Sequence, residues 1–525
     1  MKLTFAISII KVSVFIFFFT NSSPGKLFAQ AVDNAINIKL SGLKQIGKID
    51  ERFQSFNVEM VEVVGGNFWI PYDQMDTSKP ITGNVVVGET KSLYRALAPI
   101  NLYEKKLRML AGALGPTYMR VSGTWANSTY FQDNDEPKIN TAPAGFKNVL
   151  SRKEWKGVVD FSKAVNAKLV ISFAISDGVR DKDSIWTPVQ AQPLANYTKS
   201  IGGIFAAAEL FNEPTYAAYG GAPKGYNAPT FAKDIDRFRS FAKSNLPNMI
   251  VLGPGSVGEG GILPPSRMAI LKTDDLLSTN PKPAFDVFSY HYYGGASQRC
   301  APAGGPGSIS PDDALSPEWL NKTVRAYTYY KGLRDKYLPG KPIWLTETAD
   351  AACGGNPWAA TFLDCFRYVE QLGRLAKEGV QVVMHNTLSA SEYGLLDQDT
   401  YQPRPNYWTA LLWSRFMGTD VYDAGSSTPG VDIFVHSLKK KPGGMALLVV
   451  NTLDTAAVFT IPSNAEQFML TASELQTKEI QLNGKDLALT ATDELPFIKG
   501  KAIGSGVIQI PAHSITFLTF NEIKK

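Results

Sequence analysis

Residues 152–175 read RKEWKGVVDFSKAVNAKLVISFAI, and they join a helical pattern to a strand pattern. Apolar side chains recur at helical spacing from Arg152 to Asn166, and the run from Lys168 to Ile175 is rich in strand-forming residues. Strands that alternate with helices need crossover connections, and such connections build a parallel sheet. This stretch therefore predicts one unit of an α/β fold.

The same alternation continues from about residue 50 to residue 417. Eight strands are expected, at Ser55–Val61, Thr117–Ser122, Lys168–Ile175, Ile204–Phe211, Met249–Gly253, Asp286–Tyr292, Pro342–Thr346 and Val380–Thr387. Helical patterns lie between them, at Leu102–Leu114, Arg152–Asn166, Pro229–Ser244, Pro317–Tyr337, Trp358–Glu378 and Pro405–Phe416. Eight such units predict a closed (β/α)8 TIM barrel with long loops. A doubly wound open sheet is the alternative, but no glycine-rich fingerprint opens a helix after the first strand.

The pattern changes after about residue 418, where no long helical period interrupts a series of short strands. These strands are expected at Val431–Ser437, Met445–Asn451, Ala457–Ile461, Gln467–Thr471, Glu479–Leu482, Gly506–Ile510 and His513–Phe520. They predict a C-terminal antiparallel β-sandwich. Ala35–Leu43 also has a strand pattern and is expected to join that sandwich. The predicted domains are a strand segment at 32–49, a catalytic barrel at 50–417 and a β-sandwich at 418–525.

The first 31 residues have the pattern of a signal peptide. Lys2 precedes a nearly continuous apolar run from Phe5 to Phe19, and Ala29-Gln30-Ala31 has the form of a cleavage site. A membrane anchor is the alternative, although Lys11 and the short apolar run argue against it. We expect a secreted or periplasmic protein with no stable membrane insertion after cleavage.

Composition excludes several classes of protein. Charged residues make up 19% and hydrophobic residues 44% of the 525 residues, which excludes a disordered chain. The net charge is only +5 and no basic stripe is present, so nucleic acid is not an expected partner. Aromatic residues reach 11%, and they either stack on sugar faces or fill a large core. Three cysteines and four histidines without a close cluster predict no metal site.

Two glutamates stand where a barrel enzyme places its chemistry, at the C-terminal ends of strands. Glu213 lies in Leu210-Phe211-Asn212-Glu213-Pro214 after the fourth expected strand, and Glu347 follows the seventh. Glycoside hydrolysis needs such a pair, in which one carboxylic acid protonates the leaving oxygen and one carboxylate attacks the anomeric carbon. Either glutamate alone could be a solvated loop residue. Their joint placement favours catalysis.

Several further stretches resemble a known family. The Asn212-Glu213-Pro214 and Glu347 pair looks like the glycosidase clan with its acid/base on strand four and its nucleophile on strand seven. The stretches 107–110 (LRML), 115–124 (GPTYMRVSGT), 393–397 (YGLLD), 405–408 (PNYW) and 411–412 (LL) are similar to glycoside hydrolase family 79, the β-glucuronidase and heparanase group. The resemblance extends from about residue 50 to residue 425.

This resemblance implies roles for individual residues. Glu213 would be the general acid/base and Glu347 the nucleophile of a retaining mechanism. The family binds the sugar carboxylate through backbone N–H groups of a glycine pair and through a tyrosine, which match Gly354-Gly355 and Tyr393 here. An ordinary turn and a core aromatic are the alternatives. Ala352-Cys353 before the pair departs from the family pattern.

The resemblance implies four more contacts with the sugar or the nucleophile. His291 would line the sugar site and Tyr293 would donate a hydrogen bond to Glu347, which lowers the pKa of that carboxyl. A structural layer of aromatic side chains at the barrel rim is the alternative. Asn212 would bind the sugar 2-hydroxyl. Glu59 would hold outer hydroxyls, unless it forms a salt bridge within the rim.

Loops after the sixth and seventh strands contain Cys300 and Cys353, which could pair as a disulfide on the active face if their geometry allows. Arg180, Lys182 and Arg299 lie in loops on the same face. They could contact an acidic polysaccharide, although scattered loop cations are usually only solvated.

Together these features predict a secreted retaining β-glucuronidase that acts on a carbohydrate substrate and needs no metal or organic cofactor. One alternative is an endo-acting, heparanase-like hydrolase of a uronic-acid polysaccharide. Another is a retaining glycosidase of the same clan that acts on a neutral sugar. A non-catalytic carbohydrate-binding protein on a decayed barrel is the third, and the retention of both Glu213 and Glu347 argues against it.

Overall fold

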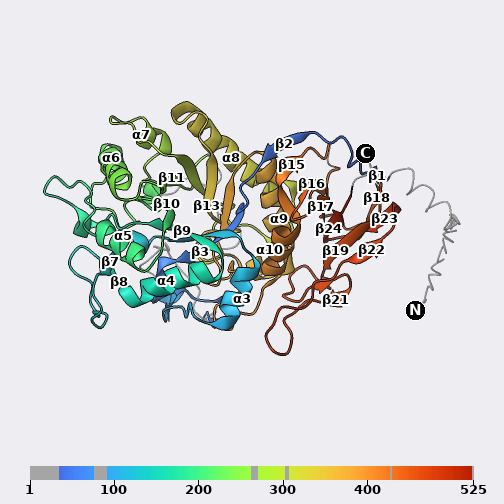
Figure 1. Cartoon of the computed structure of the whole chain (residues 1–525), viewed down its shortest axis with the longest axis horizontal. Helices are drawn as coiled ribbons and strands as arrows, with labels where there is room; N and C mark the ends of the chain where they lie inside the picture. Colours follow the sequence, from blue (N-terminus) through green and yellow to red (C-terminus); the bar gives the residue numbers. More distant parts are fainter. Residues whose placement is uncertain (1–34, 76–90, 262–269, 302–306, 426–427, 523–525) are drawn as a thin grey trace, which may run out of the picture.

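The computed structural model describes residues 35–75, 91–261, 270–301, 307–425 and 428–522 (Figure 1). The predicted signal peptide at residues 1–31 lies outside these ranges. Among the described residues, no helix has both the length and the apolar character needed to cross a membrane.

In the described part of the chain, eight parallel strands close into a barrel, which confirms the predicted (β/α)8 fold. In barrel order the strands are β3 (Gln54–Glu59), β6 (Thr117–Ser122), β9 (Ala167–Ser172), β10 (Phe205–Glu209), β11 (Ile250–Ser256), β12 (Val287–Tyr293), β13 (Ile343–Ala349) and β14 (Val382–His385). Each strand pairs with the next one along the chain, and β14 pairs with β3 to close the barrel.

Helices follow the strands and cover the barrel. They are α2 (Met60–Val64), α3 (Lys105–Ala113), α4 (Arg152–Ala164), α5 (Ala191–Ser200), α6 (Ala228–Asn245), α7 (Thr273–Leu277), α8 (Pro317–Tyr337), α9 (Phe362–Lys377) and α10 (Pro405–Phe416). Helix α4 shows why the sequence folds in this way. Ser151 and Glu154 cap its first turn reciprocally, and its apolar stripe, including Trp155 and Phe161, is buried against the barrel.

Most of the strand boundaries differ from the prediction by one or a few residues, and two of these differences affect the site. Strand β10 ends at Glu209, so Glu213 lies in the following loop, four residues beyond the strand. Strand β13 continues to Ala349, because its pairing with β12 resumes after a bulge, so Glu347 lies inside the strand. The sequence also gave no prediction of α5 or of two short strand pairs on the rim. These pairs are β4 (Gly66–Trp69) with β5 (Tyr94–Leu97), and β7 (Thr129–Gln132) with β8 (Asn148–Ser151).

The barrel interior has an apolar floor near the amino ends of its strands. The floor consists of Tyr118, Val170, Ala207, Leu252, Val287, Trp344, Val382 and Met384. The next inward-facing positions toward the carboxyl ends of β6 and β10 are Arg120 and Glu209, and both are buried. The floor closes the barrel from below, so polar chemistry is confined to the carboxyl ends of the strands.

The C-terminal region forms the predicted β-sandwich, whose two sheets enclose a core of their own. The larger sheet contains β2 (Gln45–Lys48), β15 (Met417–Tyr422), β16 (Val431–Leu438), β17 (Met445–Asn451), β24 (Ser514–Phe520), β19 (Ala465–Thr471), β20 (Gln481–Leu482), β21 (Lys485–Asp486) and β22 (Lys501–Ile503). The smaller sheet contains β1 (Ile36–Asn37), β18 (Ala457–Ile461) and β23 (Gly506–Ile510). Helix α10 leads directly into β15.

The N-terminal segment joins the sandwich as predicted, but the single strand expected at Ala35–Leu43 was wrong. A turn at Ser41 and Gly42 divides the segment, and Gly42 adopts a positive φ of 72°. Strand β1 therefore pairs with β18 in the smaller sheet, while β2 pairs with β15 in the larger sheet, where the blue β2 runs beside the orange β15 in Figure 1.

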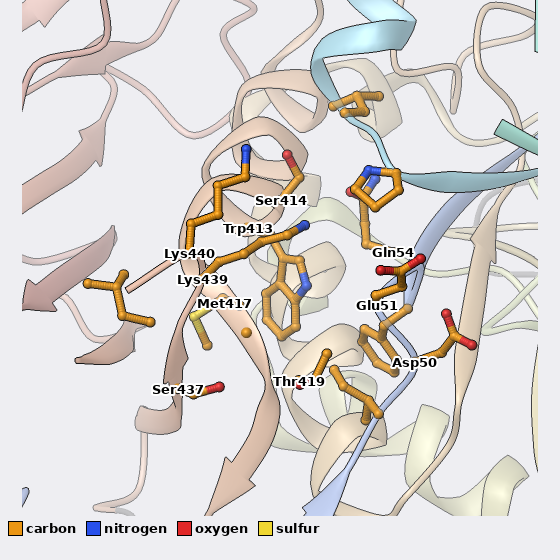
Figure 2. A pocket seen from close by; sticks show the side chains of 16 residues that line it. Asp50, Glu51, Gln54, Trp413, Ser414, Met417, Thr419, Ser437, Lys439 and Lys440 are labelled. Atoms are coloured by element: carbon orange, nitrogen blue, oxygen red, sulfur yellow. The ribbon is translucent and has the colours of Figure 1, made fainter. Parts of the chain in front are cut away.

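A cavity of about 250 Å³ lies where the barrel base meets the sandwich (Figure 2). Gln54, Pro116, Trp413 and Lys439 are among the residues that line it. Gln54 begins β3 and Pro116 precedes β6, so this cavity opens at the amino ends of the strands. It is therefore at the opposite end of the barrel from Glu213 and Glu347.

Candidate active site

The loop after β10 holds Glu213 in a constrained position. Asn127 anchors this loop, since its side chain accepts a hydrogen bond from the Asn212 N–H and donates one to the Asn212 carbonyl, both at 3.0 Å. Glu213 itself is left-handed, with φ 57° and ψ 63°, which is unfavourable for a residue with a side chain. Its carboxylate Oε1 lies 3.1 Å from His291 Nδ1, and 20% of the side chain remains exposed.

Glu347 is turned into the barrel by the bulge in β13. Tyr290 pairs with Leu345 but His291 pairs with Glu347, so Thr346 and Glu347 both direct their side chains inward. The Tyr293 hydroxyl donates to Glu347 Oε1 at 2.7 Å. Arg120 donates to Glu347 Oε2 at 2.9 Å.

Glu213 and Glu347 face each other closely. One carboxylate oxygen of each, together with a His291 ring nitrogen, lies within 4.8 Å of the others. Carboxyl groups about 5–5.5 Å apart are typical of retaining glycosidases, whereas inverting enzymes leave about 6.5–9.5 Å for a water molecule. The separation in this structure fits the first geometry.

The surroundings shift the pKa values of the two carboxyls in opposite directions. Burial and the charge of Glu347 raise the pKa of Glu213, even though the His291 contact opposes the change. Burial also disfavours ionisation of Glu347, but the charges of His291 and Arg120 and the hydrogen bonds from Tyr293 and Arg120 hold its pKa below the ordinary value. One group is therefore poised as an acid and the other as an anion.

Arg120 and Glu209 organise this pair, although neither residue was predicted to take part in the site. Arg120 in β6 donates to Glu209 Oε2 at 2.8 and 3.0 Å and to Asn212 Oδ1 at 2.8 Å, in addition to Glu347. Ser289 and Thr346 donate to the other oxygen of Glu209. The sequence did contain a signal for both residues, namely a charged residue inside an apolar strand. Such a residue must have a buried partner.

Glu209 is unsuited to chemistry despite its position at the end of β10. Its side chain is 1% exposed, and both oxygens already accept hydrogen bonds. The Arg120 charge overcomes the effect of burial and holds the pKa of Glu209 well below its ordinary value. Glu209 therefore stays ionised and balances the positive charge of Arg120.

His291 connects the three carboxylates. Its Nδ1 contacts Glu213, and its Nε2 lies 3.2 Å from an Arg120 guanidinium nitrogen and 3.8 Å from Glu209 Oε2. Although burial alone would lower the pKa of His291, the charge of Glu347 and the contacts with Glu209 and Glu213 raise it to about 9. The imidazole is thus positively charged at neutral pH.

Tyr393, a predicted sugar contact, is joined to the same network. Asn386 donates to the Tyr293 hydroxyl at 3.1 Å and to the Tyr393 hydroxyl at 3.3 Å. The predicted Gly354-Gly355 pair lies beside it, because a Cβ on Gly355 would stand 3.1 Å from the Tyr393 ring. The structure therefore brings the glycine pair and Tyr393 together and links Tyr393 to the Tyr293 that contacts Glu347.

Glu59 ends β3 on the same face and is buried. Its Oε2 has no hydrogen-bond partner among the described residues. Burial and the charge of Glu347 raise the pKa of Glu59 well above its ordinary value, although the Arg120 charge opposes the change. Gly123 is required beside it, because a Cβ at that position would overlap the Glu59 carboxyl.

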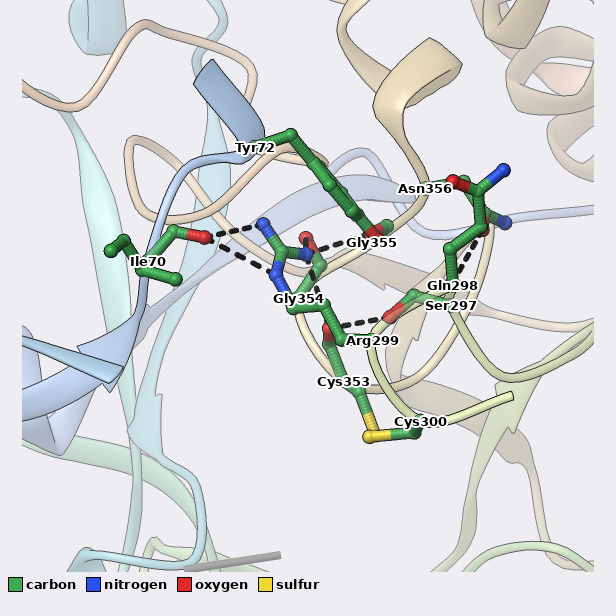
Figure 3. The surroundings of a disulfide bond; sticks show 10 residues. All are labelled: Ile70, Tyr72, Ser297, Gln298, Arg299, Cys300, Cys353, Gly354, Gly355 and Asn356. Atoms are coloured by element: carbon green, nitrogen blue, oxygen red, sulfur yellow. Dashed lines mark hydrogen bonds between the residues drawn. A yellow bond between two sulfur atoms is a disulfide. The ribbon is translucent and has the colours of Figure 1, made fainter. Parts of the chain in front are cut away.

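Cys300 and Cys353 are joined by a disulfide that ties the loop after β12 to the loop after β13 (Figure 3).

Arg180 and Arg299 are neither solvated nor free to contact a polysaccharide, so both roles considered for them were wrong. Arg299 is 1% exposed and donates to backbone carbonyls, and Arg180 is buried in an ion pair with Asp234. Lys182 is exposed, as expected.

Glu213, His291 and Glu347 are also donor types that can bind a divalent cation. The Arg120 guanidinium, however, already contacts Glu347 Oε2 and would repel a cation at that position. The arrangement therefore favours acid–base chemistry over metal binding.

Comparison with known proteins identifies relatives along most of the chain, although no protein-family model matches it. Heparanase-like protein 1 of Arabidopsis thaliana is 23% identical over 91% of this chain and 91% of that protein. Heparanase of Bos taurus is 25% identical over 81% of this chain and 85% of that protein. Baicalin-beta-D-glucuronidase of Scutellaria baicalensis is 30% identical, over 41% of each chain.

Solved structures share the fold. A 4-O-alpha-L-rhamnosyl-beta-D-glucuronidase from Fusarium oxysporum superposes with a TM-score of 0.60 at 12% identity, covering 92% of this chain and 100% of that chain. An arabinofuranosidase of glycoside hydrolase family 51 from Xanthomonas axonopodis pv. citri gives 0.59 at 16% identity, covering 93% and 99%. With the relatives, these similarities define the chain as a glycoside hydrolase. The relatives named heparanase, heparanase-like and glucuronidase support its predicted similarity to glycoside hydrolase family 79, the heparanase and β-glucuronidase-like family.

Proposed function

We propose that this chain is a retaining β-glucuronidase that hydrolyses β-glucuronides by double displacement. The observation that carries the proposal is the close pair of carboxyls, within 4.8 Å, whose pKa values are shifted in opposite directions. Glu213 acts as the general acid/base and Glu347 as the nucleophile.

In the first step, Glu347 attacks the anomeric carbon while Glu213 gives its proton to the glycosidic oxygen, so the C–O bond breaks and the aglycone leaves as an alcohol. This step produces a glycosyl ester on Glu347. Glu213, now a carboxylate, then removes a proton from water, whose oxygen displaces Glu347 and releases the sugar. The positive charges of His291 and Arg120 keep Glu347 ionised before the attack.

The relatives and the polar groups around the pair support the proposed substrate class. Two relatives are a heparanase and a baicalin-beta-D-glucuronidase, which supports a uronic-acid sugar as the substrate. We assign its carboxylate to the N–H groups of Gly354-Gly355 and to the hydroxyl of Tyr393, which lie together on the active face. Asn212 and Glu59 would bind hydroxyl groups of the sugar.

The test compares Glu213→Gln and Glu347→Gln with the wild type on an aryl β-glucuronide. Each variant should lose about 10²-fold or more of kcat/KM, since each removes one of the two reacting carboxyls. Glu259→Gln is a matched control, because Glu259 is another buried glutamate in a neighbouring loop, where it is hydrogen-bonded to Thr273. Near-wild-type turnover by the Glu347→Gln protein would refute the mechanism.

Internal cleavage of a uronic-acid polysaccharide is the second candidate, and the match to heparanase over 85% of that protein favours it. The size of the products from a heparan-type chain separates the two modes. Single uronic-acid units support exo action, and long fragments support endo action. A parallel panel of aryl β-xyloside and β-glucoside tests the alternative of a neutral sugar.

We also propose that the chain is exported after cleavage near Ala29-Gln30-Ala31. The Cys300–Cys353 disulfide supports export, because such bonds persist mainly in oxidising compartments. N-terminal sequencing of the protein recovered from the periplasm or medium tests the proposal. A mature N-terminus at Met1 would contradict it.

A further inference from the structure

The glycine pair on the active face belongs to an unusual turn. Cys353, Gly354 and Gly355 have φ angles of 65°, 79° and 79°, so three successive residues are left-handed. Two of them are glycines, for which this conformation is ordinary, but Cys353 has a Cβ and resists it. Something outside the turn must therefore hold it in this shape.

Arg299 holds the carbonyl side of the turn (Figure 3). One guanidinium nitrogen, Nη1, donates to the carbonyls of Cys353, Gly354 and Gly355 at 3.3, 3.2 and 2.9 Å. The other two nitrogens donate to the carbonyl of Ile70 at 3.2 and 2.7 Å. A single buried cation thus draws three consecutive peptide carbonyls toward one point.

Tyr72 and the disulfide also fix the guanidinium and the turn. The Tyr72 ring lies 3.8 Å from the guanidinium carbon, and its hydroxyl donates to the Gly355 carbonyl at 3.2 Å. The disulfide ties Cys353 to Cys300, the residue next to Arg299 in the chain. The carbonyl side of the turn is therefore held by hydrogen bonds, by an aromatic face and by a covalent bond.

The side of the turn that faces away from Arg299 is the side that a ligand can contact. Peptide N–H and C=O groups point in opposite directions, so carbonyls gathered on Arg299 direct the N–H groups of the same peptides away from it. The backbone N–H of Gly354 has no acceptor among the described residues. Arg299 cannot itself bind the substrate, because it is 1% exposed and all three of its nitrogens already donate to carbonyls.

We propose that Arg299, assisted by the Cys300–Cys353 disulfide, is the positioning residue that makes this active site selective for a carboxylated sugar. It acts through the backbone: it shapes the 353–355 turn so that the turn offers N–H donors to the sugar carboxylate. This inference rests on the proposed function. It adds a residue that never touches substrate but determines which substrate is preferred.

The test uses Arg299→Lys and Arg299→Met with 4-nitrophenyl β-D-glucuronide and 4-nitrophenyl β-D-glucoside. A lysine keeps the charge but cannot reach several carbonyls at once, so both variants should lose the turn geometry. We expect KM for the glucuronide to rise about tenfold or more with little change in kcat, while kcat/KM for the glucoside stays within about threefold. Inhibition constants of isofagomine and its uronic-acid counterpart give the same comparison without turnover.

Arg180→Lys is the matched control, because Arg180 is also a buried loop arginine but its partner is Asp234. Its selectivity should equal that of the wild type. Equal losses on both sugars in the Arg299 variants, or unchanged selectivity, would overturn the proposal. A wild type with no activity on any glucuronide would instead refute the proposed function.

A second perturbation covers the case in which Arg299 variants do not fold. The double variant Cys300→Ser/Cys353→Ser keeps Arg299 and removes only the covalent tie. It should raise KM for the glucuronide more than for the glucoside, and reducing agent should have the same effect on the wild type but none on the variant. Wild-type selectivity in the folded double variant, unaltered by reducing agent in either protein, would contradict the assigned role of the disulfide.

Discussion

The hydrogen bond from Tyr293 to Glu347 gives a quantitative prediction for Tyr293→Phe. The hydroxyl donates to Glu347 Oε1 at 2.7 Å and is one cause of the lowered pKa of that carboxyl. A hydrogen bond to a charged group contributes about 1.5–3 kcal/mol. Because one pKa unit corresponds to about 1.4 kcal/mol, loss of the bond should raise the pKa of Glu347 by about one to two units.

The sign of the effect on activity follows from the proposed role of Glu347 as an anionic nucleophile. The nucleophile is inactive when protonated, so activity falls as the pH drops through its pKa. A raised pKa moves this acid limb of the profile to higher pH, by about one to two units. The alkaline limb, which reports loss of the Glu213 proton, should move much less, because Tyr293 makes no hydrogen bond to Glu213.

The assay is the pH dependence of kcat/KM on an aryl β-glucuronide, which reports the ionisations of the free enzyme. Tyr292→Phe is the control, since Tyr292 is adjacent in β12 and faces the helices instead of the barrel interior. Asn386 keeps its bond to Tyr393 in the Tyr293 variant, which limits secondary changes. An acid limb that moves by less than about 0.3 unit in Tyr293→Phe would refute the reasoning.

Three further predictions concern the same cluster. Arg120→Met should lower the free energy of unfolding by about 3–5 kcal/mol, because it leaves the buried Glu209 charge without its partner. Urea unfolding measures this free energy, and a loss below about 1 kcal/mol would contradict the prediction. Glu213→Gln should lose far more activity on an alkyl glucuronide than on a 2,4-dinitrophenyl glucuronide, since only the poor leaving group needs a proton; equal losses would remove Glu213 from the acid role. His291 has a pKa of about 9 in the fold against an ordinary 6.5, so its charge stabilises the protein fully below about pH 6.5 and this contribution disappears as the pH rises through 9. The stability gap between wild type and His291→Gln should therefore shrink by about 3 kcal/mol over that interval, and a constant gap would contradict the assignment.

The fold could be predicted from sequence because its signals are local. Helix α8 begins and ends at the predicted residues Pro317 and Tyr337, where Ser316 caps the first turn and the apolar period is long. Strand β6 likewise matches the prediction from Thr117 to Ser122. The missed boundaries have a different origin. The bulge that extends β13 past Thr346 depends on pairing with β12, and no pattern within the strand itself encodes that partner.

The two glutamates proposed as acid/base and nucleophile could also be selected from the sequence, because each follows a run of apolar residues with a strand pattern. The groups that tune them could not be assigned in the same way. Arg120 belongs to β6, Glu209 to β10, His291 to β12 and Asn386 follows β14, and only barrel closure brings their side chains together. Arg299 was misjudged for a similar reason, since its carbonyl partners come from two other loops.

Burial explains how the pKa values of Glu209, Glu347 and Glu213 can differ so widely within one barrel. Water is largely excluded from all three, so each carboxyl takes its charge state from its neighbours. Glu209 has two guanidinium bonds and two hydroxyl donors, so it remains ionised and sealed. Glu347 shares the same arginine and adds Tyr293, which favours an anion that can still reach a sugar. Glu213 has His291 as its one hydrogen-bond partner among the described side chains, so burial dominates and favours the proton. The proposed division of labour between acid and nucleophile therefore depends on the donors that surround each carboxyl, and exchanging those donors should exchange the order of the pKa values.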